Sequence, residues 1–283
     1  MKTRKPCVAD AFYAGTKAEL TDQITECFTH RFGPGFVPKP VSDGPRNVIG
    51  IVSPHAGYMY SGPVAANGYS RLANDGRPEV FVILGPNHTG LGSGLAIQTE
   101  GAWETPLGIV SIDSELATKI QKSSGILDVD ERAHANEHSV EVQLPFVQFL
   151  FGNEVKFVPI CMMMQDLRTS REVARSIVEQ TKGKNVAIIA SSDFTHYEPH
   201  ETASRKDNEA IDAILKLDDE ALNELGESNR VTMCGYGPIT TLIAAAKMLG
   251  GAEAELLAHR TSGDITGDKS AVVGYSSIVF SRQ

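Results

Sequence analysis

The sequence is poor in the features that mark several protein classes. No run of apolar residues approaches the roughly 20 that a membrane-spanning helix needs. Lys and Arg form no block, and 35 acidic against 26 basic residues give a net charge of −9 at pH 7. Basic residues open the chain without an apolar segment after them, so they do not resemble a secretory signal. We therefore expect a cytoplasmic protein that binds neither nucleic acid nor membranes.

Cysteine is scarce and scattered. The four cysteines are Cys7, Cys27, Cys161 and Cys234, and no two of them form a C-x-x-C pair. In a chain of this length without a secretory signal, that spacing predicts free thiols in a reducing compartment. The G-x-x-x-x-G-K-[ST] and G-x-S-x-G motifs are also missing, so neither a phosphate-binding loop nor a serine nucleophile at a strand-to-helix turn is indicated.

Continuous apolar runs alternate with amphipathic segments along the chain, as in sheets whose strands are buried on both faces. The expected strands are 48–52, 79–84, 94–99, 109–112, 155–162, 186–190, 254–258 and 271–280. The expected helices are 16–32, a helix opening at 62–63, 114–123, 170–182, 201–226 and 239–249. This alternation predicts an α/β fold, a three-layer α/β/α sandwich around a mixed, mostly parallel sheet, in a single domain over residues 1–283.

Four local features refine this prediction. Thr16 is placed to cap the first helix, and Pro63 suits the first position of the second helix. Residues 103–108 are expected to form a turn, and Pro145 predicts a break in the helical pattern that follows His138.

Histidines follow three of the predicted buried strands. His55 lies just past 48–52, His88 just past 79–84, and His196 just past 186–190. Ligands of open α/β sheets bind outside the carboxyl ends of the strands, so neighbouring strands would bring the three imidazoles together. Imidazole is a ligand for Zn, Cu, Fe and Ni, which makes this edge a candidate metal site. Taken singly, each histidine is equally compatible with a hydrogen-bonded turn residue.

Cys234 and Asp193 lie in turns that flank the same region. Cys234 precedes a helix, whose first N–H groups stabilise a thiolate. Its alternative role is that of a small buried apolar residue. Asp193 precedes His196 in one turn and is placed to orient its imidazole, or else to cap the turn.

A short stretch, His134-Ala-Asn-Glu137-His138, matches the H-x-x-E-H pattern of inverted zinc metallopeptidases. That class needs a long regular helix, which Pro145 argues against. Glu137 and His138 are therefore predicted to line a pocket as acid/base or hydrogen-bonding groups. Asp264 and Asp268 are predicted to cap and turn a loop.

The ordered motifs resemble one known family over nearly the whole chain. They are PHAGY at 54–58, LGPNH at 84–88, EHS at 137–139 with QLPF at 143–146, SDFTHY at 192–197, and Cys234 with Gly235. RKP at 4–6, TPLG at 105–108, TSGD at 261–264 and VGY at 273–275 fit as well. Together they are similar to the Memo family, also described as AmmeMemoRadiSam system protein B.

The resemblance implies a fold shared with the LigB-like class III extradiol dioxygenases, in which two histidines and a glutamate bind non-haem Fe(II). By that match His55 and His88 are the imidazole ligands and Cys234 takes the place of the glutamate. His196, with Asp193 beside it, is the acid/base histidine. Fe(II) is the implied metal, with copper and zinc as alternatives, because a thiolate favours softer metals.

The sequence-based hypothesis is metal-dependent redox or oxygen chemistry on a small molecule or modified residue. An alternative is a non-catalytic binding module, since Memo-like proteins are linked to phosphotyrosine peptides, with Tyr60 and Trp103 as aromatic pocket residues. A zinc hydrolase is the third hypothesis. The resemblance also implies pathway partners of the radical-SAM and AMMECR types.

Overall fold

The structure of the protein, a computed structural model, describes residues 2–282. Its strands join into one 12-stranded sheet. Their bounds are β1 (Thr3–Arg4), β2 (Val48–Ser53), β3 (Val80–Pro86), β4 (Leu95–Ile97), β5 (Ala102–Thr105), β6 (Gly108–Ile112), β7 (Asp128–Val129), β8 (Lys156–Met162), β9 (Val186–Ser191), β10 (His196–Glu198), β11 (Ala252–Thr261) and β12 (Val272–Arg282).

Helices connect most of these strands. Within residues 2–282 they are α1 (Lys17–Thr29), α2 (Tyr58–Asp75), α3 (Ser114–Ser124), α4 (Arg132–Ala135), the 3-10 helix η1 (Glu141–Gln143), α5 (Leu144–Phe151), α6 (Leu167–Gln180), α7 (His200–Leu215), α8 (Asp219–Glu227), α9 (Tyr236–Leu249) and α10 (Ser262–Thr266). In this part of the chain, no helix combines the length and the apolar character that crossing a bilayer requires.

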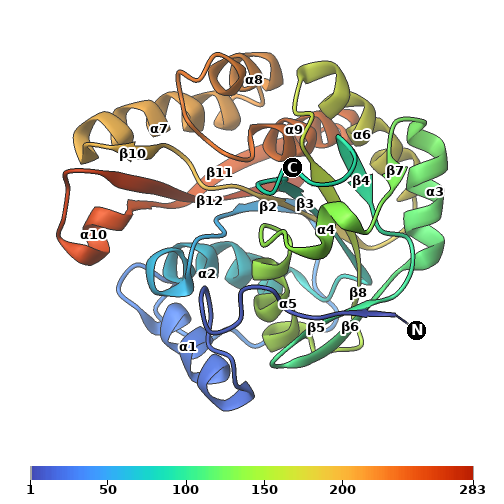
Figure 1. The fold of residues 1–283 in the computed structure, drawn as a ribbon, viewed down its shortest axis with the longest axis horizontal. Coiled ribbons are helices and arrows are strands. Elements are labelled where there is room, and N and C mark those ends of the chain that lie inside the picture. The colour runs from blue at the N-terminus through green and yellow to red at the C-terminus, as the bar shows by residue number, and fades with distance from the viewer. Residues whose placement is uncertain (1, 283) are drawn as a thin grey trace.

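The sheet is mixed, with a parallel centre. From edge to edge the order is β1-β5-β6-β8-β3-β9-β2-β12-β10, with β4 beside β8, β7 beside β4 and β11 beside β12. Strands β6, β8, β3, β9 and β2 run parallel, whereas β5 pairs antiparallel with β6, and β12 pairs antiparallel with β2, β10 and β11. Helices α1, α2 and α5 pack on one face, and α3, α6, α8 and α9 on the other (Figure 1). The predicted three-layer α/β/α architecture is confirmed.

The central strands show why the apolar runs predicted this fold. Every residue of β2 and β3 is buried, as is β9 apart from its first residue. Helices cover both faces of the sheet here, so a strand gains from apolar side chains at every position rather than at alternate ones. The antiparallel pair of β11 and β12 was also predicted, and it is joined by the short helix α10.

The second helix begins earlier than predicted. Its first residue is Tyr58, and Pro63 lies inside it rather than at its start. The backbone N–H groups of Tyr60 and Ser61 both donate to the Gly57 carbonyl, so one turn is already closed before the proline. The missing N–H of Pro63 then removes a single bond from a helix that tertiary packing holds.

Residues 103–105 are a strand and not the start of a turn. Trp103 lies in β5 and is fully buried, with its indole N–H donating to Gln98 Oε1 at 2.9 Å. The guanidinium of Arg4 lies over its ring, 4.1 Å from the centroid. The preference of aromatic residues for strands prevailed over the turn signal of the following Thr-Pro-Leu-Gly. The prediction that Trp103 lines an open pocket is therefore wrong.

Candidate metal centre

The three strands that carry the predicted histidines are neighbours in the order β3-β9-β2. His55 lies just past the end of β2 and His88 just past the end of β3, while β9 leads into Asp193 and then His196. Parallel strands end at the same edge of a sheet, so these turns meet there. The sequence-based hypothesis required these three strands to be neighbours, and they are.

His55 is buried and held in one tautomer. Its Nδ1 lies 2.8 Å from the hydroxyl of Ser191, which also donates to the Ser139 carbonyl at 2.7 Å. A serine hydroxyl has one proton, so it must accept the proton of His55 Nδ1. The Nε2 lone pair of His55 is thereby left for a ligand. Burial, together with the neighbouring histidines, holds the pKa of His55 well below its usual range, so the ring is neutral.

His88 is held in the same tautomer by a carboxylate. Its Nδ1 lies 2.9 Å from Glu137 Oε1, which also accepts the backbone N–H of Ser139 at 2.8 Å. Burial raises the pKa of Glu137, but the hydrogen bond and charge of His88 outweigh it and bring the pKa to about 2. An ionised carboxylate behind a histidine fixes the ring and increases its basicity as a metal ligand.

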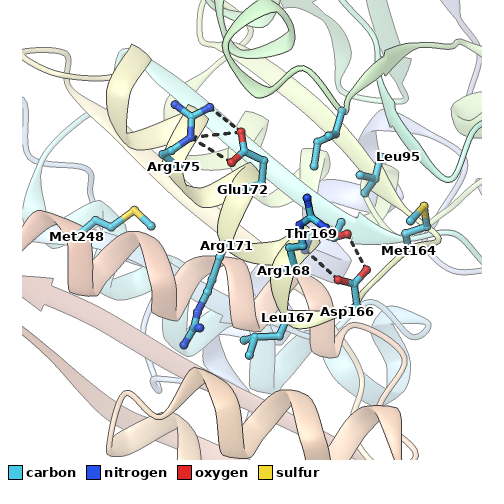
Figure 2. A pocket seen from close by; sticks show the side chains of 11 residues that line it. Leu95, Met164, Asp166, Leu167, Arg168, Thr169, Arg171, Glu172, Arg175 and Met248 are labelled. Atoms are coloured by element: carbon cyan, nitrogen blue, oxygen red, sulfur yellow. Dashed lines mark hydrogen bonds and ion pairs between the residues drawn. The ribbon is translucent and has the colours of Figure 1, made fainter.

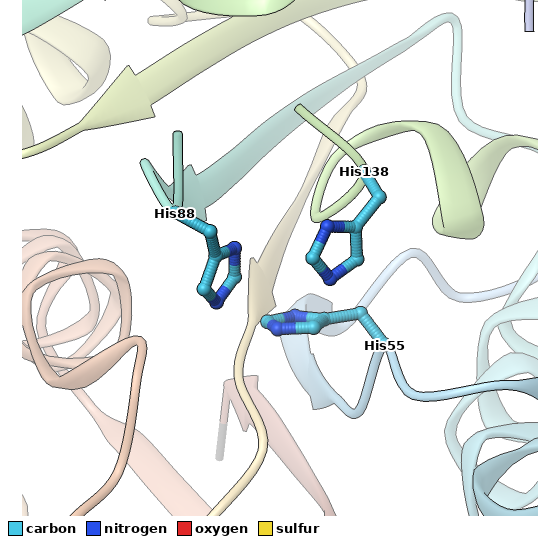
Figure 3. Close-up of side chains that lie close together, drawn as sticks. All are labelled: His55, His88 and His138. Atoms are coloured by element: carbon cyan, nitrogen blue, oxygen red, sulfur yellow. The ribbon is translucent and has the colours of Figure 1, made fainter. Parts of the chain in front are cut away.

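His138 joins these two rings, although the sequence assigned it only to the pocket. Its ring stacks on that of His88 with centroids 4.6 Å apart, and the centroid of His55 is 5.4 Å away. Figure 3 shows His88 and His138 side by side, both facing His55. One potential ligand atom from each of the three lies within 4.8 Å of the others. Burial lowers the pKa of His138 to about 4.

Cys234 contacts the ring of His55 directly. Its Sγ is 3.2 Å from His55 Nε2 and accepts the backbone N–H of Asp193 at 3.3 Å. Two such ligands on one tetrahedral metal would be about 3.5 Å apart, given metal–nitrogen and metal–sulfur bonds of about 2.0 and 2.3 Å. The next residue must be glycine, because a Cβ on Gly235 would lie 2.4 Å from the Ser191 carbonyl oxygen.

The predicted thiolate character of Cys234 is wrong for the metal-free chain. Burial and then the carboxylate of Asp193 raise the pKa of the thiol, and these effects exceed the stabilisation from backbone and Ser192 hydrogen bonds. Cys234 is a neutral thiol until a cation displaces its proton. All four cysteines are free thiols, as the sequence predicted.

His196 is oriented by a backbone group rather than by Asp193. Its Nδ1 lies 2.8 Å from the Thr232 carbonyl, which can only accept, so Nδ1 carries the proton and Nε2 has the lone pair. Asp193 instead accepts the backbone N–H of His55 at 2.8 Å. Burial raises the pKa of Asp193 to about 6. No sequence signal pointed to Thr232, whereas Ser191 could be found at the end of its strand.

The H-x-x-E-H pattern does not form a helical metal site. His134 lies in the four-residue helix α4, and His138 lies beyond its end. His134 packs against the ring of Trp103 instead, with centroids 5.7 Å apart. Asp264 forms a capping box with Thr261, and Asp268 accepts hydrogen bonds from Ser270, as the sequence predicted.

Tyr60, the remaining predicted pocket residue, lines a neighbouring cavity of about 360 Å³ together with Tyr197 and Tyr275. A larger cavity, about 950 Å³, lies against α6 and contains none of the predicted site residues. Figure 2 shows Arg175 of that cavity paired with Glu172, so the charge of this arginine is neutralised within the protein. The histidine cluster therefore remains the best candidate site.

Known proteins resemble this chain over its full length. MEMO1 family proteins of Methanopyrus kandleri and Pyrobaculum aerophilum are 53% and 51% identical to it, and alignment with the first covers 99% of each chain and with the second 100%. A solved structure of an uncharacterized Escherichia coli K12 protein matches in fold alone, with a TM-score of 0.51 and 13% identity over 72% of this chain and 86% of that one. The family described as Memo-like protein matches residues 4–279, and the chain belongs to that family.

Proposed function

We propose that the protein is a metal-dependent enzyme of redox or oxygen chemistry, with His55, His88 and Cys234 as metal ligands. The observation that carries the proposal is the 3.2 Å contact between Cys234 Sγ and the Nε2 of His55, a ring that Ser191 holds in the ligating tautomer. His88 offers a second Nε2, because Glu137 occupies its Nδ1. The reaction class is the one that the sequence motifs imply through their resemblance to the Memo family and, by way of its fold, to non-haem iron dioxygenases.

The donor set fits a first-row transition metal. Two imidazoles and a thiol that can lose its proton suit iron, copper or zinc, and the thiolate shifts the preference toward softer ions. Three protein ligands leave a position for substrate. Iron, the metal of the similar enzymes, would supply Lewis acidity and electron exchange with oxygen when bound.

The remaining groups of the site can bind and move protons. His196 keeps a lone pair on Nε2, since its Nδ1–H donates to the Thr232 carbonyl, and it is placed to accept a proton from substrate. Asp193 fixes the backbone of His55 and the thiol of Cys234 rather than the ring of His196. His138 stacks on the ring of His88 and adds a third imidazole to the site.

Metal content after anaerobic purification tests the ligand set. We expect about one equivalent of metal in the wild type and almost none in the double variant His55→Ala, Cys234→Ala. His138→Asn is the matched control, and it should retain the metal. Equal and negligible metal in wild type and double variant would refute a metal centre.

A zinc hydrolase is the second candidate, and the three-imidazole cluster of His55, His88 and His138 is the observation that favours it. Three histidines with one open position are a known hydrolytic zinc set. In that case His138→Asn, and not Cys234→Ser, abolishes metal binding. Zinc as the bound ion and hydrolysis of model esters would then replace oxygen consumption as the activity.

A further inference from the structure

The cavity lined by Tyr60, Tyr197 and Tyr275 lies next to the candidate metal centre and has no role in metal binding. It encloses about 360 Å³, and its other lining residues are Ser262, Thr266, Asp268, Ala271 and Val273. Tyr197 directly follows His196, and their ring centroids are 5.7 Å apart. A group bound among the tyrosines would therefore lie beside the proposed acid/base histidine.

The charge at the lining of this cavity is negative. Asp268 is the charged residue of its lining, and among the described lining residues there is no Lys, Arg or His. The two hydrogen bonds to Asp268, from the Ser270 backbone and hydroxyl, both fall on Oδ1. These bonds lower the pKa of Asp268, so the carboxylate is ionised at neutral pH. An anion such as phosphate would find no counter-charge here.

Tyr197 is held in an unusual conformation. Its φ is +59°, in the left-handed region that bulky residues rarely adopt, and 78% of the residue is exposed. The pairing of β10 with β12 shifts register between His196 and Glu198, so Tyr197 is the bulged residue. Bulges next to active sites redirect a side chain. A strained backbone that holds an aromatic ring in an exposed position motivates the hypothesis that the ring contacts a ligand.

We propose that this cavity binds an organic cation, an alkylated ammonium group, between the tyrosine rings and Asp268. The negative faces of aromatic rings attract such cations, and cages of aromatic residues with a carboxylate are suited to quaternary ammonium groups. The volume matches a small group rather than a whole drug-sized ligand. Where the proposed function holds, the cation is part of the substrate and the rest of that molecule extends past His196 to the metal.

Calorimetric titration with choline, against its neutral isostere 3,3-dimethyl-1-butanol, tests the proposal. The titrations use the full chain in the presence of EDTA, so that binding does not depend on the metal. We expect choline to bind and the isostere to bind at least about tenfold more weakly. Tyr197→Ala should weaken choline binding by roughly 2- to 30-fold, the range of one cation–aromatic contact. Asp268→Asn should weaken it as well, because it removes the carboxylate charge that faces the cation.

Two variants separate ring contact from other effects. Tyr197→Phe keeps the ring and should bind choline as the wild type does. Phe36→Ala removes an exposed aromatic residue outside the cavity, and it should change nothing. Equal affinity for choline and its isostere would overturn the proposal, as would phenyl phosphate binding more tightly than choline and losing that affinity in Tyr197→Ala. If the protein binds choline but carries no metal in any preparation, this inference stands and the metal centre alone is refuted.

Discussion

Glu141 and His55 are both buried polar groups, yet their hydrogen bonds are arranged in opposite ways. The carboxylate of Glu141 accepts from the Arg4 guanidinium at 2.5 Å, the Tyr13 hydroxyl at 2.6 Å and the backbone N–H groups of Cys7 and Val8 at 2.9 and 3.1 Å. Nothing is left for a ligand. This cluster fastens the start of the chain to the body of the protein.

In the candidate metal centre, each ring is supported by a hydrogen bond at its Nδ1 atom. Ser191, Glu137 and the Thr232 carbonyl occupy the Nδ1 atoms of His55, His88 and His196. Each ring thereby keeps an Nε2 lone pair directed away from its support. A saturated polar cluster stabilises the fold, whereas a half-saturated one offers ligands, and burial alone does not separate the two.

Glu141→Ala is the variant with the largest expected effect on stability. Removing the carboxylate leaves the guanidinium of Arg4 buried without its partner, which costs about 3–5 kcal/mol. Urea denaturation measures this loss, and the metal content per folded chain should stay unchanged. Glu115→Ala is the control, because the ion pair of Glu115 with Lys119 is exposed and screened by solvent, so its loss should leave the urea midpoint almost unchanged. Loss of metal without loss of stability would contradict the structural role of Glu141.

Acid titration sharpens the same prediction. Burial raises the pKa of Glu141, but the charge of Arg4 and the hydrogen bonds from Tyr13 and Cys7 outweigh it, so the folded-state pKa lies below the ordinary value of 4.5. The stabilisation is complete above the unfolded-state pKa and is lost as the pH falls through the folded-state pKa. The wild type should therefore lose stability more steeply below pH 4.5 than Glu141→Gln, whose amide does not titrate.

Much of the fold could be predicted from the sequence. The apolar runs at 48–52, 79–84 and 186–190 identify β2, β3 and β9, because two-sided burial gives an unbroken apolar signal. The failures concern local signals that packing overrides. Pro63 lies inside a helix that packs against the sheet, and Trp103 lies in a strand under Arg4, a partner far away in the sequence.

The site could be predicted in part. Position after a strand singled out His55 and His88, position before a helix singled out Cys234, and the family resemblance combined the three as one ligand set. The stacking of His138 on His88 depends on how the chain from α4 to η1 folds back, which no periodicity describes. The Thr232 carbonyl that orients His196 is a backbone group, and backbone groups have no sequence signature.

Glu137→Gln tests the candidate metal centre, as Glu141→Ala tests the cluster around Glu141. The amide keeps the volume but loses the charge behind His88, and loss of such a carboxylate typically weakens metal binding by about 10- to 100-fold. Metal affinity, measured by competition with a chelator of known strength, should fall by that factor while the urea midpoint falls less than in Glu141→Ala. A variant that loses stability but binds metal as tightly as the wild type would place Glu137 in the same structural class as Glu141.

Tyr197→Gly has the smallest expected effect, and it separates stability from ligand binding. A left-handed backbone costs a bulky residue about 1–2 kcal/mol, whereas glycine adopts it freely but has more conformational entropy to lose on folding. The net result should be a gain of about 0.5–1 kcal/mol in thermal or urea denaturation. Asn229→Gly, at a φ of +56°, is the control and should gain less, since asparagine tolerates this region. Tyr197→Ala keeps the strain and should gain nothing. If Tyr197→Gly is instead less stable than the wild type, the ring of Tyr197 contributes to packing. Tyr197 would then have a structural role, like Glu141, and not a role in ligand binding.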